Sequence, residues 1–202
     1  MAGGYTFFCK GLPENSRRIH SVRFAIRTKL HQTLLESPVA ISERLMTLRI
    51  PLAKHRYATF ISTYAPTLPS DDETKDHYYA MLRSTLMQVP RRDKLIVLGD
   101  FNARIGSDSK IRGNVMGKHG VSNINSNGHR LLSLCSEFGL FVTNTLFQLK
   151  HNLSVDLTSA AWVEEQTCPA YVQPYRLILH RSQIVHLCRF KAARTLQNSG
   201  TH

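Results

Sequence analysis

The stretch KLIVLGDFNARIG, residues 94–106, indicates both the fold class and the candidate site of this sequence. Its first half is almost wholly apolar, which predicts a strand buried on both faces, as in the sheets of α/β proteins. The strand runs into Gly99 and Asp100, and Asn102 follows two residues later. Open α/β sheets bind ligands at the carboxyl ends of their strands, so we expect this carboxylate and this amide at a ligand-binding edge.

The pair formed by Asp100 and Asn102 has a chemical and a structural interpretation. Alternation along an extended chain would place both on one side, with Phe101 pointing into the core. The carboxylate could then orient or deprotonate a water while the amide steadies a phosphate oxygen. A nearby divalent cation would reinforce both roles. In the structural interpretation Asp100 caps a turn and Asn102 is its hydrogen-bonding neighbour, which is the commoner case for an isolated Asp-x-Asn pattern.

The segments around this strand predict a layered α/β domain, because strands and helices follow one another along the chain. Alternating or β-branched apolar residues predict further strands over 5–9, 21–27, 44–50, 57–63 and 140–147. Two segments beyond residue 150, LILH at 177–180 and QIVHLCRF at 183–190, are open between short strands and one poor helix.

Two helices are expected between these strands. The first begins at the capping-box pattern of Ser70 and Glu73 and is stopped by Pro90. Its apolar face carries residues at helical spacing, namely Tyr78, Leu82, Leu86 and Val89. The second helix is capped by Asn125 or Ser126, presents Leu131, Leu134, Cys135 and Phe138, and ends at Gly139.

Length and composition are those of one intracellular α/β domain. The chain has 202 residues and 42% hydrophobic residues, and no apolar run reaches the length of about 18 residues that a membrane span needs. The amino-terminal sequence lacks the pattern of a secretory signal. The 4 cysteines are widely spaced, which argues against a zinc cluster or a disulfide framework and favours reduced thiols.

The charge balance favours a polyanionic partner. Lys and Arg total 26 against 14 acidic residues, a formal net charge of +12, which fits nucleic acid first and an anionic membrane second. A basic composition without such a partner is the alternative. In the loop 104–125, Arg104 and Lys118 could contact phosphates, or the loop could simply be solvated.

Two motifs carry a resemblance to a known family. VLGDFNAR (97–104) resembles the Gly-Asp-Phe-Asn motif of the endonuclease/exonuclease/phosphatase superfamily, and ISTYAPT (61–67) resembles that superfamily's strand ending in Tyr-x-Pro. The similarity runs almost continuously to residue 150 and looks closest to the endonuclease domain of RTE-type non-LTR retrotransposons. It implies a partial DNase I-like four-layer α/β sandwich over 1–150 and a divergent basic tail over 151–202.

The resemblance also implies roles for individual residues. Asp100 matches the catalytic Asp that positions or activates the attacking water, and Asn102 matches the Asn that binds the scissile phosphate. Tyr64 matches the Tyr whose hydroxyl contacts that phosphate. The implied reaction is hydrolysis of a phosphodiester in DNA with Mg²⁺ (or Mn²⁺), at an intracellular, nuclear location, with Arg104 and Lys118 turned toward the DNA.

The sequence departs from the family where the metal and the base should be held. The family's first-strand Asn and metal-binding Glu would precede Met1, and the Asp-His that closes the family's domain has no counterpart in 151–202. Asp100 would then hold a metal weakly, because such sites need several convergent oxygens. We therefore expect weak or lost endonuclease activity. The alternative is a non-catalytic nucleic-acid-binding remnant or a degenerate fragment, and a phosphatase of small phosphoesters is a more distant third.

Overall fold

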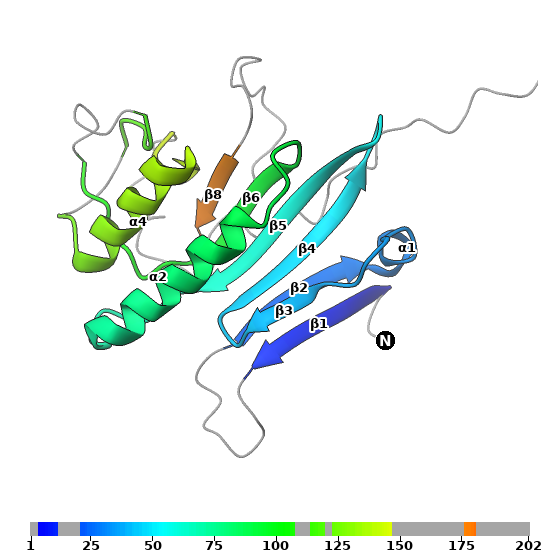
Figure 1. The fold of residues 1–202 in the computed structure, drawn as a ribbon, viewed down its shortest axis with the longest axis horizontal. Helices are drawn as coiled ribbons and strands as arrows, with labels where there is room; N and C mark the ends of the chain where they lie inside the picture. The colour runs from blue at the N-terminus through cyan, green and yellow to red at the C-terminus, as the bar shows by residue number, and fades with distance from the viewer. Residues whose placement is uncertain (1–3, 12–20, 108–113, 120–122, 147–175, 181–202) are drawn as a thin grey trace, which may run out of the picture.

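The computed structural model describes residues 4–11, 21–107, 114–119, 123–146 and 176–180 (Figure 1). Its strands are β1 Tyr5–Gly11, β2 Ser21–Arg27, β3 Val39–Ser42, β4 Leu45–Leu52, β5 Arg56–Tyr64, β6 Lys94–Asp100, β7 Phe141–Val142 and β8 Arg176–His180. Its helices are α1 Thr28–His31, α2 Asp72–Met87, α4 Ser126–Phe138 and the 3₁₀ helix η1 Thr143–Leu146.

The strands form one large and one small sheet. The large sheet has six strands in the order β3-β4-β5-β6-β8-β7, and the small one pairs β1 with β2. Strands β3, β4 and β5 are antiparallel, whereas β6 is parallel to β5 and β8 is parallel to both β6 and β7. The connection from β5 through α2 to β6 is therefore a parallel crossover, which brings the carboxyl ends of β5 and β6 to one edge.

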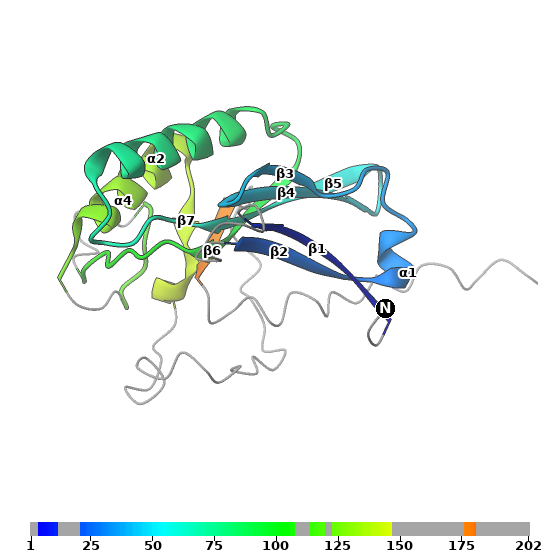
Figure 2. The same ribbon diagram turned by 90° about the horizontal axis from the view of Figure 1, so that it is seen from below.

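The layers stack as helices, large sheet and small sheet (Figure 2). Helices α2 and α4 cover one face of the large sheet, where Ile61, Leu95 and Val97 pack with Tyr78 and Leu82 in the main core. The expected helical spacing of the first helix is confirmed, since three of the four expected apolar residues are buried within α2 and the fourth is buried just beyond its end. The mixed α/β class is likewise confirmed.

The small sheet lies on the other face of the large sheet. Val22 and Ile26 are 3% and 4% exposed, so they face the large sheet, whereas Arg23 and Ala25 on the opposite side of β2 are exposed. Arg23 is one of the outward residues, so its charge is solvated rather than buried. A helix layer outside β1 and β2 is not among the residues that the structure describes.

The amino-terminal cap of α2 differs from the expected capping box. Asp71 is the cap, and its carboxylate accepts hydrogen bonds from the backbone N–H and the hydroxyl of Thr74. Ser70 instead lies within hydrogen-bonding distance of the Thr67 hydroxyl. The prediction of Ser70 was wrong because two candidate caps were adjacent and the ionised carboxylate makes the stronger bond to a helix amino terminus.

The expected boundaries of α4 are confirmed. Asn125 is its cap, with a side chain that accepts the backbone N–H of Gly128. Gly139 ends the helix in the left-handed conformation, at a φ of 61°. Cys135 is fully buried on the apolar face, and this burial raises the pKa of its thiol to about 12.

The strand expected over 140–147 is mostly absent. Only Phe141 and Val142 are extended, and η1 follows at once. The hydroxyl of Thr145 donates to the carbonyl of Val142 and accepts the N–H of Gly117, so a side chain takes the place of a ladder partner. The short elements α1 and β3 have no counterpart among the expected segments.

Residues assigned to the basic tail contribute one strand to the large sheet. β8 contains the LILH segment and lies between β6 and β7, which selects the strand interpretation of that segment. The QIVHLCRF segment and the rest of 151–202 lie outside the described residues. No helix in the described part of the chain is long and apolar enough to cross a membrane.

Candidate functional site

Tyr64 and Asp100 lie side by side at the carboxyl edge of the large sheet. They end β5 and β6 and are partners in the parallel register of these strands. Along β6, Leu95 and Val97 belong to the core under the helices. Alternation therefore turns Asp100 to the opposite face, toward the small sheet, and the register gives Tyr64 the same direction. The structure thus brings together two of the residues that the sequence singled out.

Gly99 is required for the close approach of the two strand ends. A Cβ built on Gly99 would lie 1.9 Å from the backbone oxygen of Thr63, closer than any real contact. One step later the backbone N–H of Ala65 donates to the carbonyl of Asp100 at 2.9 Å. The ladder between β5 and β6 therefore continues into the loops that follow them.

Asn102 is held by a turn rather than by strand alternation. Its φ is 47°, a left-handed conformation that is uncommon for a residue with a side chain. Its backbone N–H donates to Oδ1 of Asp100 at 3.0 Å, and its Nδ2 donates to the carbonyl of Ala65 at 2.9 Å. Alternation correctly places Phe101, which is 0% exposed, in the core. For Asn102 that argument was wrong, and the turn interpretation describes its contacts.

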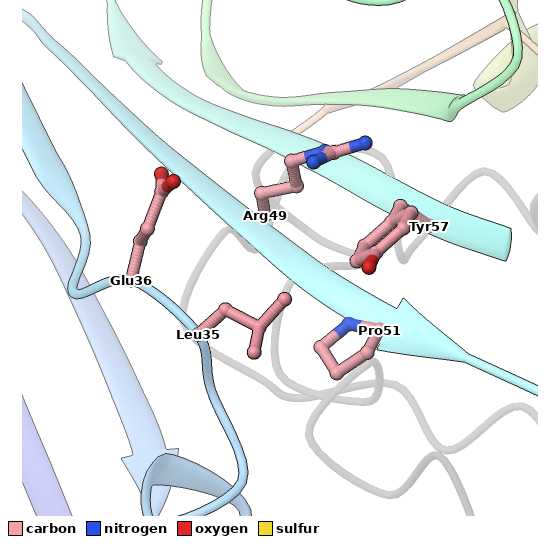
Figure 3. A pocket seen from close by; sticks show the side chains of 5 residues that line it. All are labelled: Leu35, Glu36, Arg49, Pro51 and Tyr57. Atoms are coloured by element: carbon pink, nitrogen blue, oxygen red, sulfur yellow. The ribbon is translucent and has the colours of Figure 1, made fainter. Parts of the chain in front are cut away.

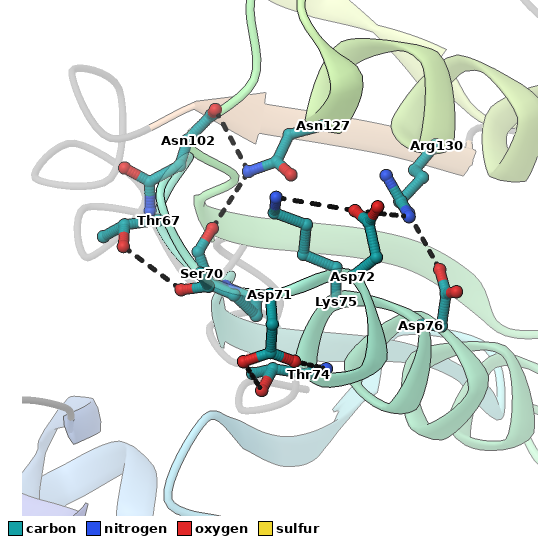
Figure 4. A network of polar contacts seen from close by, with 11 residues as sticks. Thr67, Ser70, Asp71, Asp72, Thr74, Lys75, Asp76, Asn102, Asn127 and Arg130 are labelled. Carbon is teal, nitrogen blue, oxygen red and sulfur yellow. Dashed lines mark hydrogen bonds and ion pairs between the residues drawn. The ribbon is translucent and has the colours of Figure 1, made fainter.

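Two asparagines at the start of α4 fix the loops that follow β5 and β6, and Figure 4 shows one of them, Asn127. Nδ2 of Asn127 donates to the carbonyls of Pro66 at 2.9 Å and Asn102 at 3.3 Å, which joins the two loops. Nδ2 of Asn125 donates to the same Asn102 carbonyl at 3.3 Å. We call Asn125 and Asn127 the amide clamp. The sequence predicted a capping role for Asn125 and did not predict these contacts of the two asparagines with the loops.

The buried position of Asn127 makes the clamp unusual. Asn127 is 0% exposed, and its Oδ1 has no hydrogen-bond partner among the described residues. Its backbone carbonyl accepts the hydroxyl of Tyr79 from α2. A buried amide with an unsatisfied oxygen is costly, so its two donor bonds to the loops must outweigh that cost.

The helix start also pins the backbone of Arg104. The N–H of Arg104 donates to Oδ1 of Asn125 at 3.1 Å, and its carbonyl accepts the N–H of Asn125 at 3.0 Å. A Cβ on Gly128 would lie 1.9 Å from the Arg104 carbonyl oxygen, so this contact needs glycine. The backbone of Arg104 is therefore fixed while its side chain is exposed.

Ion pairs tie α4 to α2 beside the clamp, as Figure 4 shows. Arg130 donates to Asp76 through Nε at 2.9 Å and to Asp72 through Nη2 at 3.1 Å. The hydrogen bond to Asp76 is the main reason that the pKa of Arg130 is raised. Lys75 is buried and lies 3.7 Å from Asp72. These contacts fix the relative position of the two helices over the loop ends.

Arg44 is a site residue that sequence reasoning missed. Its Nη1 donates to the carbonyl of Tyr64 at 3.2 Å, and its guanidinium lies 6.0 Å from the centroid of the Tyr64 ring. The only sequence signal was an arginine immediately before an apolar strand, which has many meanings.

Below the edge, burial raises the pKa of the Tyr78 phenol, which lies 2.6 Å from the Thr63 hydroxyl.

The two predicted cations sit on different segments. Arg104 follows β6 directly, whereas Lys118 belongs to 114–119, beside η1. There the N–H of His119 donates to the carbonyl of Thr145. Both predicted cations are exposed.

The described residues do not form a complete metal site. No group of three or more His, Cys, Asp and Glu that could hold an ion occurs in the described ranges. Asp100 alone does not supply the several oxygens that Mg²⁺ needs. One Asp-His pair does occur, Asp76 and His77, but it lies in α2 and its carboxylate binds Arg130. It is not the pair that closes the family's domain.

A small hollow lies on β4 and β5 (Figure 3). It is lined by Leu35, Glu36, Arg49, Pro51 and Tyr57, and its volume of about 20 Å³ has room for roughly one water. It is therefore not a substrate pocket.

The sequence is similar to two proteins named craniofacial development protein 2. The protein from Bos taurus is 29% identical over 144 residues, which are 71% of this chain and 23% of that relative. The protein from Tragulus javanicus is 28% identical over 144 residues, 71% of this chain and 24% of the relative. The chain thus spans about a quarter of the length of these relatives. No family model matches the sequence, and no solved structure gives a significant match.

Proposed function

We propose that this chain carries the phosphate-contacting part of a DNase I-like endonuclease site and hydrolyses DNA only weakly. The observation that supports this most is the register of Tyr64 and Asp100 at the carboxyl ends of two parallel strands. Ligands of open α/β sheets bind at such edges. The similarity to craniofacial development protein 2 supports a relation to the endonuclease/exonuclease/phosphatase superfamily, with an RTE-type retrotransposon as the proposed origin.

The proposed roles are those that the family resemblance implies, and the position of each side chain supports them. Asp100 orients the attacking water, since a carboxylate can accept its proton or fix its direction. Tyr64 and Asn102 contact the scissile phosphate, where donors stabilise the charge that develops in the transition state. Asn102 suits this role because its backbone N–H, its carbonyl and its side-chain amide are each held by a hydrogen bond, in a backbone conformation that costs energy.

The family's metal does not fit the described residues, so no step of the proposal passes through it. Mg²⁺ or Mn²⁺ remains the proposed cofactor of the family reaction. Because Asp100 is the single carboxylate assigned to the site, we expect hydrolysis by this chain to be weak. We propose the fold as a partial DNase I-like sandwich made of the helix layer, the large sheet and the small sheet, without a helix layer over the outer face of β1 and β2 among the elements that the structure describes.

The proposed substrate is DNA, at an intracellular and nuclear location. The net charge of +12 favours a phosphate backbone, and exposed Arg104 follows the candidate edge directly. Lys118 extends the proposed contact to the 114–119 segment. These cations position a duplex without reading its sequence.

A nicking assay tests the proposal. The chain is incubated with supercoiled plasmid and Mg²⁺, beside Asp100→Ala and a control, Glu137→Ala, which removes an exposed carboxylate at the far end of α4. We expect slow nicking that Asp100→Ala lowers at least tenfold and Glu137→Ala leaves unchanged. Equal nicking by all three proteins would remove catalysis from this chain.

The second candidate function is DNA binding without cleavage. It is favoured by the absence of a metal-ligand cluster from the described ranges. In that case the affinity for DNA falls steeply with salt, and the chain and Asp100→Ala bind alike and do not nick.

A further inference from the structure

We infer that the outer face of the β1–β2 sheet binds single-stranded nucleic acid, by contacts separate from those at the β5–β6 edge. This outer face consists of the residues that point away from the large sheet, namely Tyr5, Phe7, Cys9, Arg23, Ala25 and Arg27. The inference goes beyond the proposed endonuclease function, because it uses neither Tyr64 nor Asp100.

The direction of these side chains follows from burial and register. Val22 and Ile26 are buried against the large sheet, so the alternate residues of β2 face outward. In the antiparallel register Phe7 is the partner of Ala25. Arg23 and Arg27 are therefore the diagonal neighbours of Phe7, at a typical spacing of about 7–8 Å that long side chains bridge.

Phe7 is the centre of this face. Its side chain is 58% exposed, and its small partner Ala25 leaves the ring open to solvent. Tyr5 adds a second, half-buried ring on the same side of β1. An exposed aromatic ring on a sheet is a platform on which an unpaired base can stack.

The arginines on this face have no carboxylate partner within the part of the chain that the structure describes. β1 and β2 contain no acidic residue, and neither Arg23 nor Arg27 forms an ion pair with any described residue. Other arginines of the chain, such as Arg49 and Arg130, are committed to carboxylates. A ring between two guanidinium groups that no described carboxylate pairs with therefore offers one base and its flanking phosphates a complementary surface.

The geometry favours a single strand over a duplex. In a duplex the faces of the bases are stacked on each other, so an aromatic ring on a flat sheet has no base face to meet. In a single strand the bases can unstack onto the ring while the backbone follows the cations. Stacking also tolerates any base, so we expect little sequence preference.

Fluorescence anisotropy with a labelled single-stranded oligonucleotide tests this inference on the full chain, with EDTA present so that cleavage cannot contribute. Phe7→Ala is expected to weaken binding about tenfold. A matched oligonucleotide of abasic sites carries the same phosphates and no bases, and its binding should not respond to Phe7→Ala. The double variant Arg23→Ser/Arg27→Ser should lower the slope of log affinity against log salt by about 1.4.

Two control variants separate this face from general effects. Arg91→Ser/Arg92→Ser removes two exposed cations from the turn before β6, and Met87→Ala truncates a side chain that is 68% exposed on α2. Both should leave the affinity and its Phe7 dependence unchanged. The inference is overturned if Phe7→Ala binds like the parent chain, or if the Arg91/Arg92 variant loses as much affinity as the Arg23/Arg27 variant. Such results would leave this face to a protein partner.

Because Asp100→Ala should bind the oligonucleotide normally, failure of the nicking assay does not bear on this result.

Discussion

The two ends of the β5–β6 pair carry one aspartate each, and the surroundings of these aspartates differ. Asp93, before β6, is 8% exposed and accepts three side-chain hydrogen bonds. Two come from Arg49, at 2.7 and 3.0 Å, and one from Thr59 at 2.8 Å. Asp100, after β6, is more exposed and accepts the backbone N–H of Asn102. The first carboxylate holds the strands together, while amides hold the loops around the second.

This difference separates structural from chemical carboxylates on one strand. At the Asp93 end the guanidinium of Arg49 also stacks on Tyr57, 3.8 Å from the ring centroid. The guanidinium is therefore held by both the carboxylate and the ring. At the Asp100 end the loops are joined through Asn127 and Asn102. Removing the carboxylate should therefore destabilise the fold at one end and change function at the other.

The largest expected effect is that of Asp93→Ala. It deprives the buried Thr59 hydroxyl and the Arg49 guanidinium of their acceptor, so we expect a loss of about 3 kcal/mol in the free energy of unfolding. The matched change Asp100→Ala should cost about 1 kcal/mol or less. Urea denaturation followed by circular dichroism measures both. Equal losses would mean that the two ends are held in the same way.

The next largest effect is a loss of stability at the Asp100 end when Asn127 is replaced. Asn127→Leu removes the donor that joins Pro66 to Asn102 and should destabilise the chain by about 2 kcal/mol. Asn127→Asp should cost more at neutral pH, because it places an unpaired charge where two carbonyls point. Its extra cost should shrink in acid, when the new carboxyl is protonated and can donate.

A control keeps this result specific to the loops. Leu134→Ala also destabilises α4, by about 2–4 kcal/mol, but it lies away from the clamp. Hydrogen exchange should speed up in residues 100–104 for Asn127→Leu more than for Leu134→Ala at equal global stability. If both variants loosen these residues alike, Asn127 is an ordinary core residue and not a clamp.

Strongly patterned segments of the fold were predictable from the sequence. The apolar run of β6 and the helical spacing of α2 and α4 predicted a buried strand and two helices with buried faces. The structure confirms these three elements. Short elements were not predictable. β3 has only four residues and pairs with β4 through a register shift, and η1 depends on a hydrogen bond to Gly117, far along the chain. The prediction of the cap of α2 was wrong for a local reason, because Ser70 and Asp71 are adjacent and either could serve as the cap.

The sequence indicated residues of the candidate site, but it did not indicate the contacts that hold them in place. The sequence GDFN at the end of an apolar strand indicated Asp100 and Asn102, and the resemblance of ISTYAPT to a family motif indicated Tyr64. The contacts of Arg44 and Asn127 were hidden, because each arises from elements that meet only in the folded chain. The alternation argument failed at Asn102, where a left-handed residue ends the strand pattern.

The smallest expected effect is a pH dependence of the free energy of unfolding that arises at the Asp93 end. The hydrogen bond from Arg49 is the main reason that the pKa of Asp93 is lowered, with the Thr59 hydroxyl acting in the same direction. A lowered folded-state pKa means that the contribution to stability is complete above the unfolded pKa of about 3.9 and is lost as the pH falls through the folded-state value. The gap in unfolding free energy between the parent chain and Asp93→Asn should thus stay constant from pH 7 to about 5 and narrow below about 4. Asp71 also has a lowered pKa, but it is present in both proteins, so its contribution cancels in the difference between their unfolding free energies. A gap that stays constant down to pH 2.5 would show that the charge of Asp93 contributes nothing, and that the strands are joined there by hydrogen-bond geometry alone.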